Sequence, residues 1–311
     1  MSALVEIILP VFLVIALGYL AVLRGFLSQS GIDGLMKFSQ GFAIPLLLFR
    51  AISTLDLSQG FDPGLLVSYY SGSTISFAAG MLGAHFLFGR DWEDSVAIGF
   101  SAMFANSLLL GLAIMERAYG PASLVPNYAI IAIHAPFCYL LGITTMEFVR
   151  HSGGGMTRTA KSVGKAMFRN SLMLAIGLGF LVNFSGLHLP QAIASGFDLI
   201  VRAALPTALF ALGGILTRYR PEGSVKVVLW VCLISLFLHP AITLFMSTQV
   251  FHLDQGQIRG AVLTASMAPG VNAFLFAGIY DRAKRVAATA VLAGTLFSVL
   301  SVSFWLHILG V

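Results

Sequence analysis

The sequence has little charge for its length. Only 10% of its 311 residues are Asp, Glu, Lys or Arg, whereas 58% are hydrophobic. A soluble domain carries about 25% charged residues, so this chain lacks the polar side chains needed to cover a surface in water. The mean hydropathy of +0.90 agrees with this. The composition excludes an ordinary soluble protein and predicts one that crosses a membrane several times.

Cysteines and familiar catalytic patterns are also scarce. Cys138 and Cys232 lie singly in apolar runs and fit neither a disulfide framework nor a metal site. The glycine run at 153–155 lacks the lysine and the strand of a phosphate-binding loop. No nucleophile–base pair and no HExxH spacing occurs. We therefore expect a protein that is not an enzyme and that uses no cofactor or metal.

What the chain does have is a series of apolar runs. A membrane-spanning helix needs about 17–25 such residues, and the first run lacks the basic flank of a signal peptide. The runs lie near residues 3–23, 36–54, 64–88, 95–116, 126–149, 168–187, 192–216, 224–248, 258–280 and 286–310. The longest loop, residues 151–167, separates residues 1–150 from residues 168–311. We predict an all-α integral membrane protein with ten transmembrane segments, five in each half.

The basic residues are unevenly distributed over the loops. Most of the 18 Lys and Arg residues fall in alternate loops, which the positive-inside rule assigns to the cytoplasm. Both termini are then expected on the outer, periplasmic side of a bacterial inner membrane. This asymmetry accounts for the net charge of +5. The lipid bilayer is the expected surrounding, and no nucleic-acid partner is needed to explain the charge.

The two halves resemble each other at an offset of 161 residues. Residues 43–49 and 204–210 share Ala, Pro, Leu and Phe, and the offset places Pro45 on Pro206. Since each half has five segments, the second half enters the membrane from the opposite side. Secondary transporters commonly have such inverted repeats, with binding sites at helices broken near the middle of the membrane.

The ninth segment contains residues that interrupt a helix. Pro269 removes a backbone donor and Gly270 lowers helix propensity, so a break is expected at membrane depth. Such a break leaves free N–H groups and a positive half-helix end beside Asn272. This combination suits an anion.

The fourth segment carries Asn106, Ser107 and Gly111 at a similar place. We predict that the two segments are crossed, broken helices that together bind a carboxylate. The alternative is ordinary hydrogen bonding between amides of neighbouring helices beside a proline kink.

Other polar residues in the apolar runs have two interpretations each. His134 could act as a substrate donor or a proton-coupling group, because imidazole titrates near neutral pH. Alternatively, it is a neutral histidine bonded to a neighbouring helix. Thr295 lies at the matching position of the tenth segment. Arg50 either attracts anions to the outer side or extends to the membrane interface. The spacing of Asp198 and Arg202 favours an ion pair within one helix.

Several stretches in combination resemble the auxin efflux carrier family. They are residues 8–12, 16–19, 43–49, 106–120, 265–269, 272 and 276–277. The short central loop is similar to that of the bacterial members, many of which are assigned to malonate or malate.

The resemblance implies an inverted repeat like that of the bile-acid sodium symporters. Segments 1, 2, 6 and 7 would form a scaffold that often dimerises, and segments 3–5 and 8–10 a moving transport domain. The implied function is elevator-like transport of small organic anions, such as mono- and dicarboxylates or auxin-like aromatic carboxylates. The family positions of the binding site correspond to Asn106, Gly111, Pro269 and Asn272. A receptor for an organic anion and an ion-coupled symporter or antiporter are the alternatives.

One position departs from the family pattern. Ala113 stands where the family usually has a proline in the fourth segment. Because alanine is the strongest helix former, it favours a more continuous fourth helix.

Overall fold

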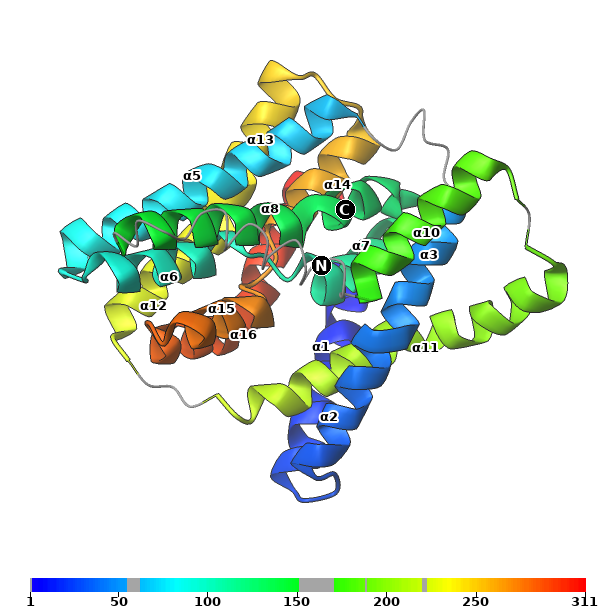
Figure 1. Ribbon diagram of the computed structural model, residues 1–311, viewed down its shortest axis with the longest axis horizontal. Helices are drawn as coiled ribbons and strands as arrows, with labels where there is room; N and C mark the ends of the chain where they lie inside the picture. Colours follow the sequence, from blue (N-terminus) through cyan, green and yellow to red (C-terminus); the bar gives the residue numbers. More distant parts are fainter. Residues whose placement is uncertain (1, 55–61, 151–170, 188, 220–222) are drawn as a thin grey trace. The chain divides into compact units, whose positions relative to one another are not determined.

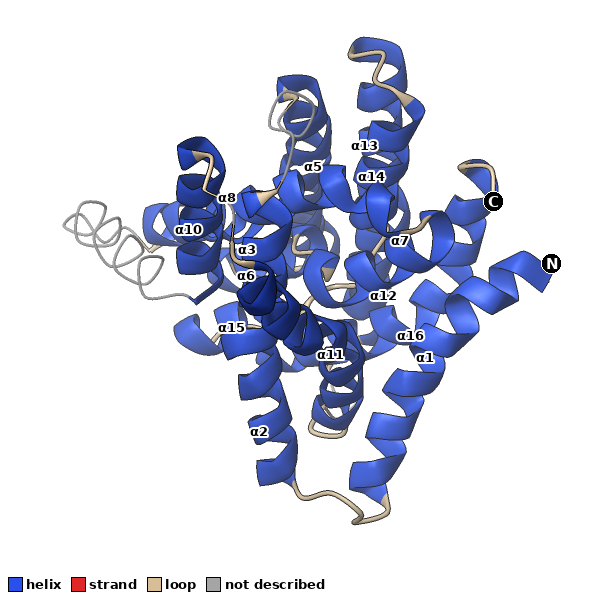
Figure 2. Cartoon of the chain, turned by 90° about the vertical axis from the view of Figure 1, so that its right-hand side faces the viewer, coloured by secondary structure: helices blue, strands red, loops and turns tan. Residues whose placement is uncertain are grey.

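The computed structural model describes residues 2–54, 62–150, 171–187, 189–219 and 223–311. These residues form helices joined by turns, and none of them belongs to a strand (Figure 2). The predicted linker at residues 151–167 lies outside this part of the chain. The expectation of an all-α protein is confirmed. In a bilayer, helices satisfy their own backbone groups without water, which is why apolar segments adopt them.

The helices follow one another in the order of the predicted segments. They are α1 (Ser2–Leu23), α2 (Gln29–Phe38), α3 (Ile44–Ser53), α5 (Pro63–Phe88), α6 (Trp92–Met103), α7 (Leu112–Tyr119), α8 (Val125–Val149), α10 (Ser171–Ser185), α11 (Gln191–Leu216), α12 (Val225–Leu233), α13 (His239–Phe245), α14 (Gln255–Ala265), α15 (Val271–Tyr280) and α16 (Lys284–Ile308) (Figure 1). Short π-helical turns join some of them, namely η1 (Ser39–Ala43), η2 (Ser107–Gly111), η4 (Ile234–Leu238) and η5 (Met246–Val250), and η3 (Pro121–Leu124) is a 3₁₀ turn.

Within the described residues, six helical stretches are long and apolar enough to cross a membrane. They are Val5–Leu23, Gln29–Ser53, Pro121–Val149, Gln191–Leu216, Val225–Val250 and Lys284–Ile308. Two further helices, α10 and α15, are apolar but shorter. The chain therefore has the helices of a multi-pass membrane protein.

Contacts along the chain divide it into two units. Unit 1 consists of Met1–Ile8, Phe61–Val163 and Tyr219–Val311. Unit 2 consists of Leu9–Gly60 and Gly164–Arg218. Each unit is thus assembled from both halves of the sequence.

Glycines set the distance between α1 and α11 in unit 2. A Cβ atom on Gly213 of α11 would lie 1.9 Å from the carbonyl oxygen of Ile15. A Cβ atom on Gly18 of α1 would lie 1.9 Å from the carbonyl oxygen of Phe210. Any side chain would overlap the facing backbone, so the two helices meet backbone to backbone, as small residues allow in membranes.

A similar glycine contact joins α10 to α3. A Cβ atom on Gly179 of α10 would lie 3.2 Å from the carbonyl oxygen of Phe49. Gly18 and Gly179 are separated by 161 residues, and so are Phe49 and Phe210. The two contacts therefore use corresponding residues of the two halves.

Arg50 has an ion-pair partner in unit 2. Its Nε donates to Oδ1 of Asp198 at 3.0 Å, and its Nη2 donates to Oδ2 at 3.3 Å. The pair predicted between Asp198 and Arg202 is therefore wrong. The guanidinium of Arg50 engages both carboxylate oxygens of Asp198 from the facing helix, a bidentate geometry that adds specificity to the pair. The pair ties α3 to α11.

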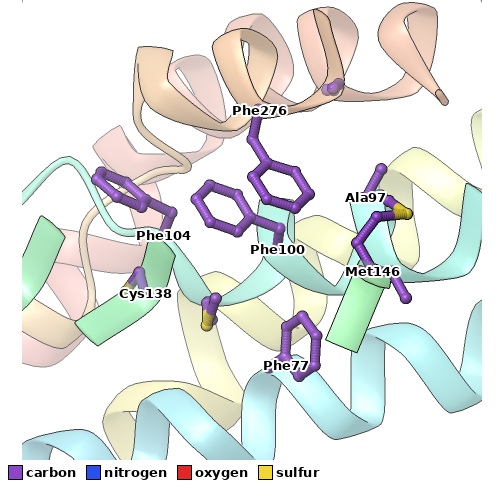
Figure 3. Packing of buried hydrophobic residues seen from close by; sticks show 11 residues of the cluster. Phe77, Ala97, Phe100, Phe104, Cys138, Met146 and Phe276 are labelled. Carbon is purple, nitrogen blue, oxygen red and sulfur yellow. The ribbon is translucent and has the colours of Figure 1, made fainter. Parts of the chain in front are cut away.

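Aromatic rings fill the centre of unit 1. Phe100 of α6 and Phe276 of α15 stack with ring centroids 3.9 Å apart and planes at 4° (Figure 3). Phe104 stacks on Phe100 with centroids 5.4 Å apart. Phe77 of α5 and Met146 of α8 belong to the same buried cluster. Because Phe104 directly follows α6, this core supports the place where that helix ends.

An ion cluster joins the ends of α6, α8 and α15. Oε2 of Glu93 accepts hydrogen bonds from Nε of Arg150 and from Nε of Arg282, both at 2.9 Å. Asp91 caps α6 by accepting from the N–H of Asp94 at 2.8 Å, as an aspartate at a helix N-terminus commonly does. Burial raises the pKa of the Glu93 carboxyl, but the hydrogen bonds from the two arginines outweigh it and hold the pKa below 4.5.

Acid is expected to lower the stability of the folded protein by protonating Glu93 in this cluster. Because folding lowers the pKa of Glu93, its stabilising contribution is complete above the unfolded-state pKa and is lost as the pH falls below about 4.5. The side chain is 26% exposed, so solvent limits the contribution to about 1 kcal/mol. Thermal unfolding in detergent between pH 7 and pH 3.5 checks this. Glu93→Gln should melt lower than the wild type at pH 7 and lose less on acidification, and equal losses would contradict it.

Candidate functional site

The fourth segment is broken. α6 ends at Met103, and helical structure resumes only at Ser107, in η2. Phe104, Ala105 and Asn106 between them are not helical. Ala113 lies beyond this break, buried inside α7. The fourth segment is therefore broken before η2, and Ala113 itself is helical.

The ninth segment is broken as its Pro-Gly pair predicts. α14 ends at Ala265 and α15 begins at Val271. Pro269 and Gly270 lie in the interruption, and Gly270, with extended backbone (φ −78°, ψ 162°), is the N-cap residue of α15.

The two breaks contact each other as a minimal antiparallel bridge. The N–H of Asn106 donates to the carbonyl of Ala268 at 2.8 Å, and the N–H of Gly270 donates to the carbonyl of Phe104, also at 2.8 Å. Ala105 and Pro269 face each other between these two bonds. Pro269 thus occupies a position where the bridge requires no N–H, which is where proline is tolerated. We call residues 104–107 and 266–272 the crossover.

The start of α15 presents free backbone donors at the crossover. The first N–H groups of a helix have no carbonyl one turn earlier to bond. Ala273 bonds back to the carbonyl of Gly270 at 2.9 Å, which leaves the N–H groups of Val271 and Asn272 without such a bond. Both residues are partly exposed. The positive end of the helix dipole adds to these donors.

The start of η2 has the same property. Leu110 and Gly111 both donate to the carbonyl of Asn106, at 3.2 and 3.1 Å. The N–H groups of Ser107, Leu108 and Leu109 precede them and have no acceptor within the turn. Both broken segments therefore present helix N-terminal donors close to the bridge.

The two predicted amides add side-chain donors. Asn106 is 6% exposed, and its Nδ2 has no hydrogen-bond partner. Oδ1 of Asn272 accepts from the hydroxyl of Tyr139 at 3.2 Å. This bond fixes the amide so that Nδ2 of Asn272 is the group left to donate. An unpaired buried amide costs about 1–3 kcal/mol, and an anion at the crossover would remove that cost.

Small residues allow the crossover to pack closely. A Cβ atom on Gly294 of α16 would lie 2.6 Å from Cδ of Pro269. A Cβ atom on Gly111 would lie 3.4 Å from Cγ of Met267. Gly111 is thus placed against the ninth segment, as the predicted crossing of segments 4 and 9 requires.

His134 supports the crossover from α8. Its Nε2 lies 3.2 Å from the carbonyl oxygen of Ala105, and since a carbonyl can only accept, Nε2 carries the hydrogen. Its Nδ1 lies 3.5 Å from the hydroxyl of Tyr69. Thr295, its predicted counterpart, donates to the carbonyl of Val291 one turn earlier in its own helix.

The predicted site residues fall in both units. Unit 1 holds Asn106, Ser107, Gly111, Ala113, His134, Pro269, Gly270, Asn272 and Thr295, whereas unit 2 holds Pro45, Arg50 and Pro206. Pro45 is buried in the first turn of α3, which directly follows η1, and Pro206 lies inside α11. The contacts described above at the crossover involve Asn106, Gly111, His134, Pro269, Gly270 and Asn272 of the first group.

Sequence patterns missed three side chains beside the crossover. Tyr139 orients Asn272, Ser235 of η4 donates to the carbonyl of Met267 at 3.3 Å, and Tyr69 faces His134. The sequence patterns did not identify His239 either. A His-Pro pair inside the eighth apolar run was the available signal for it, because a buried histidine there interrupts an otherwise apolar face.

The described residues contain no group of three or more His, Cys, Asp or Glu side chains placed to hold a metal ion. Cys138 and Cys232 are free and buried there, as expected of small core residues. The site is built from backbone and amide donors.

Comparison with known proteins identifies the family. The chain matches the family described as "Membrane transport protein" over residues 3–306. It belongs to this family. The resemblance to the auxin efflux carriers is thereby confirmed.

Curated members of the membrane transport protein family align with nearly the whole chain. The "Putative malonate transporter" of Rhizobium meliloti (strain 1021) is 22% identical over 310 residues, covering 99% of this chain and 97% of that protein. The "Uncharacterized transporter YfdV" of Escherichia coli (strain K12) is 21% identical over 305 residues, covering 97% and 96%. This protein is accordingly a multi-pass membrane transporter.

Proposed function

We propose that this transporter moves small organic anions, with mono- and dicarboxylates such as malonate and malate as the substrate class. The observation that carries the proposal is the set of unpaired donors at the crossover. Two helix starts and two amide groups present N–H bonds near one bridge. A carboxylate has acceptors only, so such a set complements it without a buried Lys or Arg. Auxin-like aromatic carboxylates belong to the same chemical class.

The division into units supports an elevator-like mechanism. Unit 2 contains α2, α3, α10, α11 and α1 from Leu9 onward, which are the helices of the predicted scaffold segments 1, 2, 6 and 7. Unit 1 contains the crossover and the helices of segments 3–5 and 8–10. In the proposed mechanism the helices of unit 1 move as a body and carry the anion across the membrane.

The paired glycine contacts support the ten-segment inverted repeat. Gly18 meets Phe210, and Gly179 meets Phe49, with both glycines and both phenylalanines 161 residues apart. A two-fold relation between the halves produces such pairs. In the proposed topology both termini lie on the periplasmic side of a bacterial inner membrane, and unit 2 forms a homodimer.

The alternatives differ in what they require of the crossover. A cation–proton antiporter needs carboxylates there, and residues 104–107 and 266–272 contain neither Asp nor Glu. A receptor that binds an anion without transport shares the same donors, so flux alone separates it from a carrier.

Transport in liposomes tests the proposal. Purified protein is reconstituted with unlabelled malonate, malate or indole-3-acetate inside, and uptake of the same labelled anion is followed from outside. Exchange at least about tenfold above protein-free vesicles is expected for one or more of these anions. Binding without exchange would favour the receptor, and the absence of both for all three would overturn the proposal.

A further inference from the structure

A second polar cluster lies directly behind the crossover in unit 1. It consists of Tyr69 on α5, His134 on α8 and His239 on α13, which are 0%, 3% and 0% exposed. The ring centroid of Tyr69 lies 5.7 Å from that of His134 and 5.1 Å from that of His239. Tyr69 therefore lies between two buried imidazoles.

His239 has an unsatisfied ring. Although the backbone of Tyr69 faces it, neither Nδ1 nor Nε2 makes a hydrogen bond within standard distance and angle. Leaving a buried polar group unpaired costs about 1–3 kcal/mol. The ring of His239 is packed closely against α5, because a Cβ atom on Gly72 would lie 2.8 Å from Cδ2 of His239. A completely buried histidine held this way calls for a role other than packing.

The helix that faces the cluster carries further unsatisfied groups. The hydroxyls of Ser68 and Ser76 on α5 are buried and have no hydrogen-bond partner. At 100° per residue, Ser68, Tyr69, Gly72 and Ser76 lie within an arc of about 100° on one face of α5. Polar atoms thus continue along the helix on the side of His239.

The cluster is connected to the proposed anion site. His134 donates from Nε2 to the carbonyl of Ala105, and the next residue, Asn106, carries the unpaired amide. Charge on His134 would therefore lie in direct contact with the crossover, one residue from the unpaired amide. The hydroxyl of Tyr69 lies 3.5 Å from Nδ1 of His134, and the ring of Tyr69 packs against the ring of His239.

No charged side chain of the adjoining helices compensates this cluster. Its titratable neighbours are Tyr70, whose hydroxyl donates to the carbonyl of Ile130 at 2.7 Å, and Cys138, whose sulfur lies 3.7 Å from Nδ1 of His134. Arg259, the single charged residue of α14, is held by the carbonyl of Leu309 and the ring of Tyr119. His85, at the far end of α5, is bonded to the carbonyl of Arg90.

The charge balance couples the two sites. A proton on either imidazole would be an uncompensated buried cation, which is strongly unfavourable without a nearby negative charge. A carboxylate at the crossover supplies that charge, and in return the proton strengthens binding of the carboxylate. This reciprocity is required by linkage between the two equilibria.

We propose that Tyr69, His134 and His239 form a proton-binding site that is occupied together with the anion, so that the protein is an anion–proton symporter. The inference rests on the proposed anion transport. The proton comes from water on one side of the membrane, bonds to a ring nitrogen of the histidine pair while the anion is bound, and returns to water on the other side. No other bond forms or breaks.

A pH gradient across proteoliposomes tests the coupling. The membrane potential is clamped with potassium and valinomycin, a pH dye is enclosed, and malonate uptake is measured with malate and indole-3-acetate in parallel. With one proton per anion, an acidic exterior should raise accumulation about tenfold per pH unit. The dye should report acidification inside that depends on the external anion.

Variants separate the proton site from the anion site. His239→Gln keeps a polar side chain of similar size but has no titrating group, so accumulation driven by the pH gradient should disappear. Exchange at equal pH should persist at a lower rate, because the proton no longer strengthens binding of the carboxylate. His252→Asn is the matched control, because His252 is exposed in the loop before α14 at φ 48°, where asparagine is tolerated. It should keep both activities.

The outcomes distinguish the two proposals. Exchange of none of the three anions by the wild type would overturn the anion transport itself. Exchange without proton movement, or gradient-driven accumulation retained in His239→Gln, would overturn the proton site alone. If His239→Gln does not fold, a second measurement tests the coupling: malonate is added to the wild-type protein in unbuffered detergent solution, and the uptake of protons is followed. About one proton should be taken up for each anion bound. The absence of proton uptake would overturn the coupling.

Discussion

Replacing Asn272 by alanine is expected to lower anion exchange about 10–100-fold without loss of folded protein. The hydroxyl of Tyr139 donates a hydrogen bond to Oδ1 of Asn272, so Nδ2 of Asn272 is the donor that we expect to bind the anion. A hydrogen bond to a charged group contributes about 1.5–3 kcal/mol, and each 1.36 kcal/mol corresponds to a factor of about ten in rate. Initial exchange rates in proteoliposomes, normalised to inserted protein, measure the effect.

Two neighbouring substitutions serve as comparisons. Leu275→Ala changes the same helix at a side chain that is 50% exposed, and it should leave exchange near the wild-type rate. Tyr139→Phe keeps the ring but frees the Asn272 amide to rotate, so an intermediate loss is expected. Full exchange by Asn272→Ala would show that this amide does not bind the substrate.

Replacing Gly213 by alanine is expected to destabilise unit 2 severely. The new Cβ atom would lie 1.9 Å from the carbonyl oxygen of Ile15, and that oxygen belongs to the backbone of α1. Overpacking a side-chain core costs about 1–3 kcal/mol, and here a whole helix must shift instead of a rotamer. Since native proteins are stable by about 5–15 kcal/mol, a loss of about 3 kcal/mol or more should markedly lower both the yield of monodisperse protein and its melting temperature.

Gly196 offers a control in the same helix. Nothing lies within 4 Å of a Cβ atom built there. Gly196→Ala should therefore melt at the wild-type temperature or slightly above it, because alanine is favoured over glycine in a helix by up to about 1 kcal/mol. If Gly213→Ala and Gly196→Ala melt alike, the close contact of α1 and α11 does not contribute to stability as described.

The sequence predicted the helices and the ninth-segment break well, because those features depend on local chemistry. Apolar composition determines the helices, and Pro269 with Gly270 determines where the ninth segment ends as a helix. The break in the fourth segment was placed less securely. Its residues 104–106 contain neither proline nor glycine, and their non-helical backbone is held by two hydrogen bonds with the distant ninth segment.

Side-chain partners were harder to predict, because they depend on which helix faces which. Asp198 pairs with Arg50, 148 residues away in the sequence, and not with Arg202 one turn along its own helix. Tyr139 bonds Asn272 across 133 residues. No periodicity within one segment indicates either contact. The same reason applies to His239, whose ring contacts Tyr69 on another helix, which in turn contacts His134 on a third.

The crossover also has a consequence for synthesis of the chain. Its two hydrogen bonds join Phe104 and Asn106 to Ala268 and Gly270, so the second partner leaves the ribosome about 160 residues after the first. At 5–20 residues per second the interval is roughly 10–30 s. During that time the backbone groups of the first break have no partner from the ninth segment, and lipid cannot satisfy them. The fourth segment must therefore remain beside polar protein, such as the insertion machinery, until the ninth segment arrives to complete the bridge.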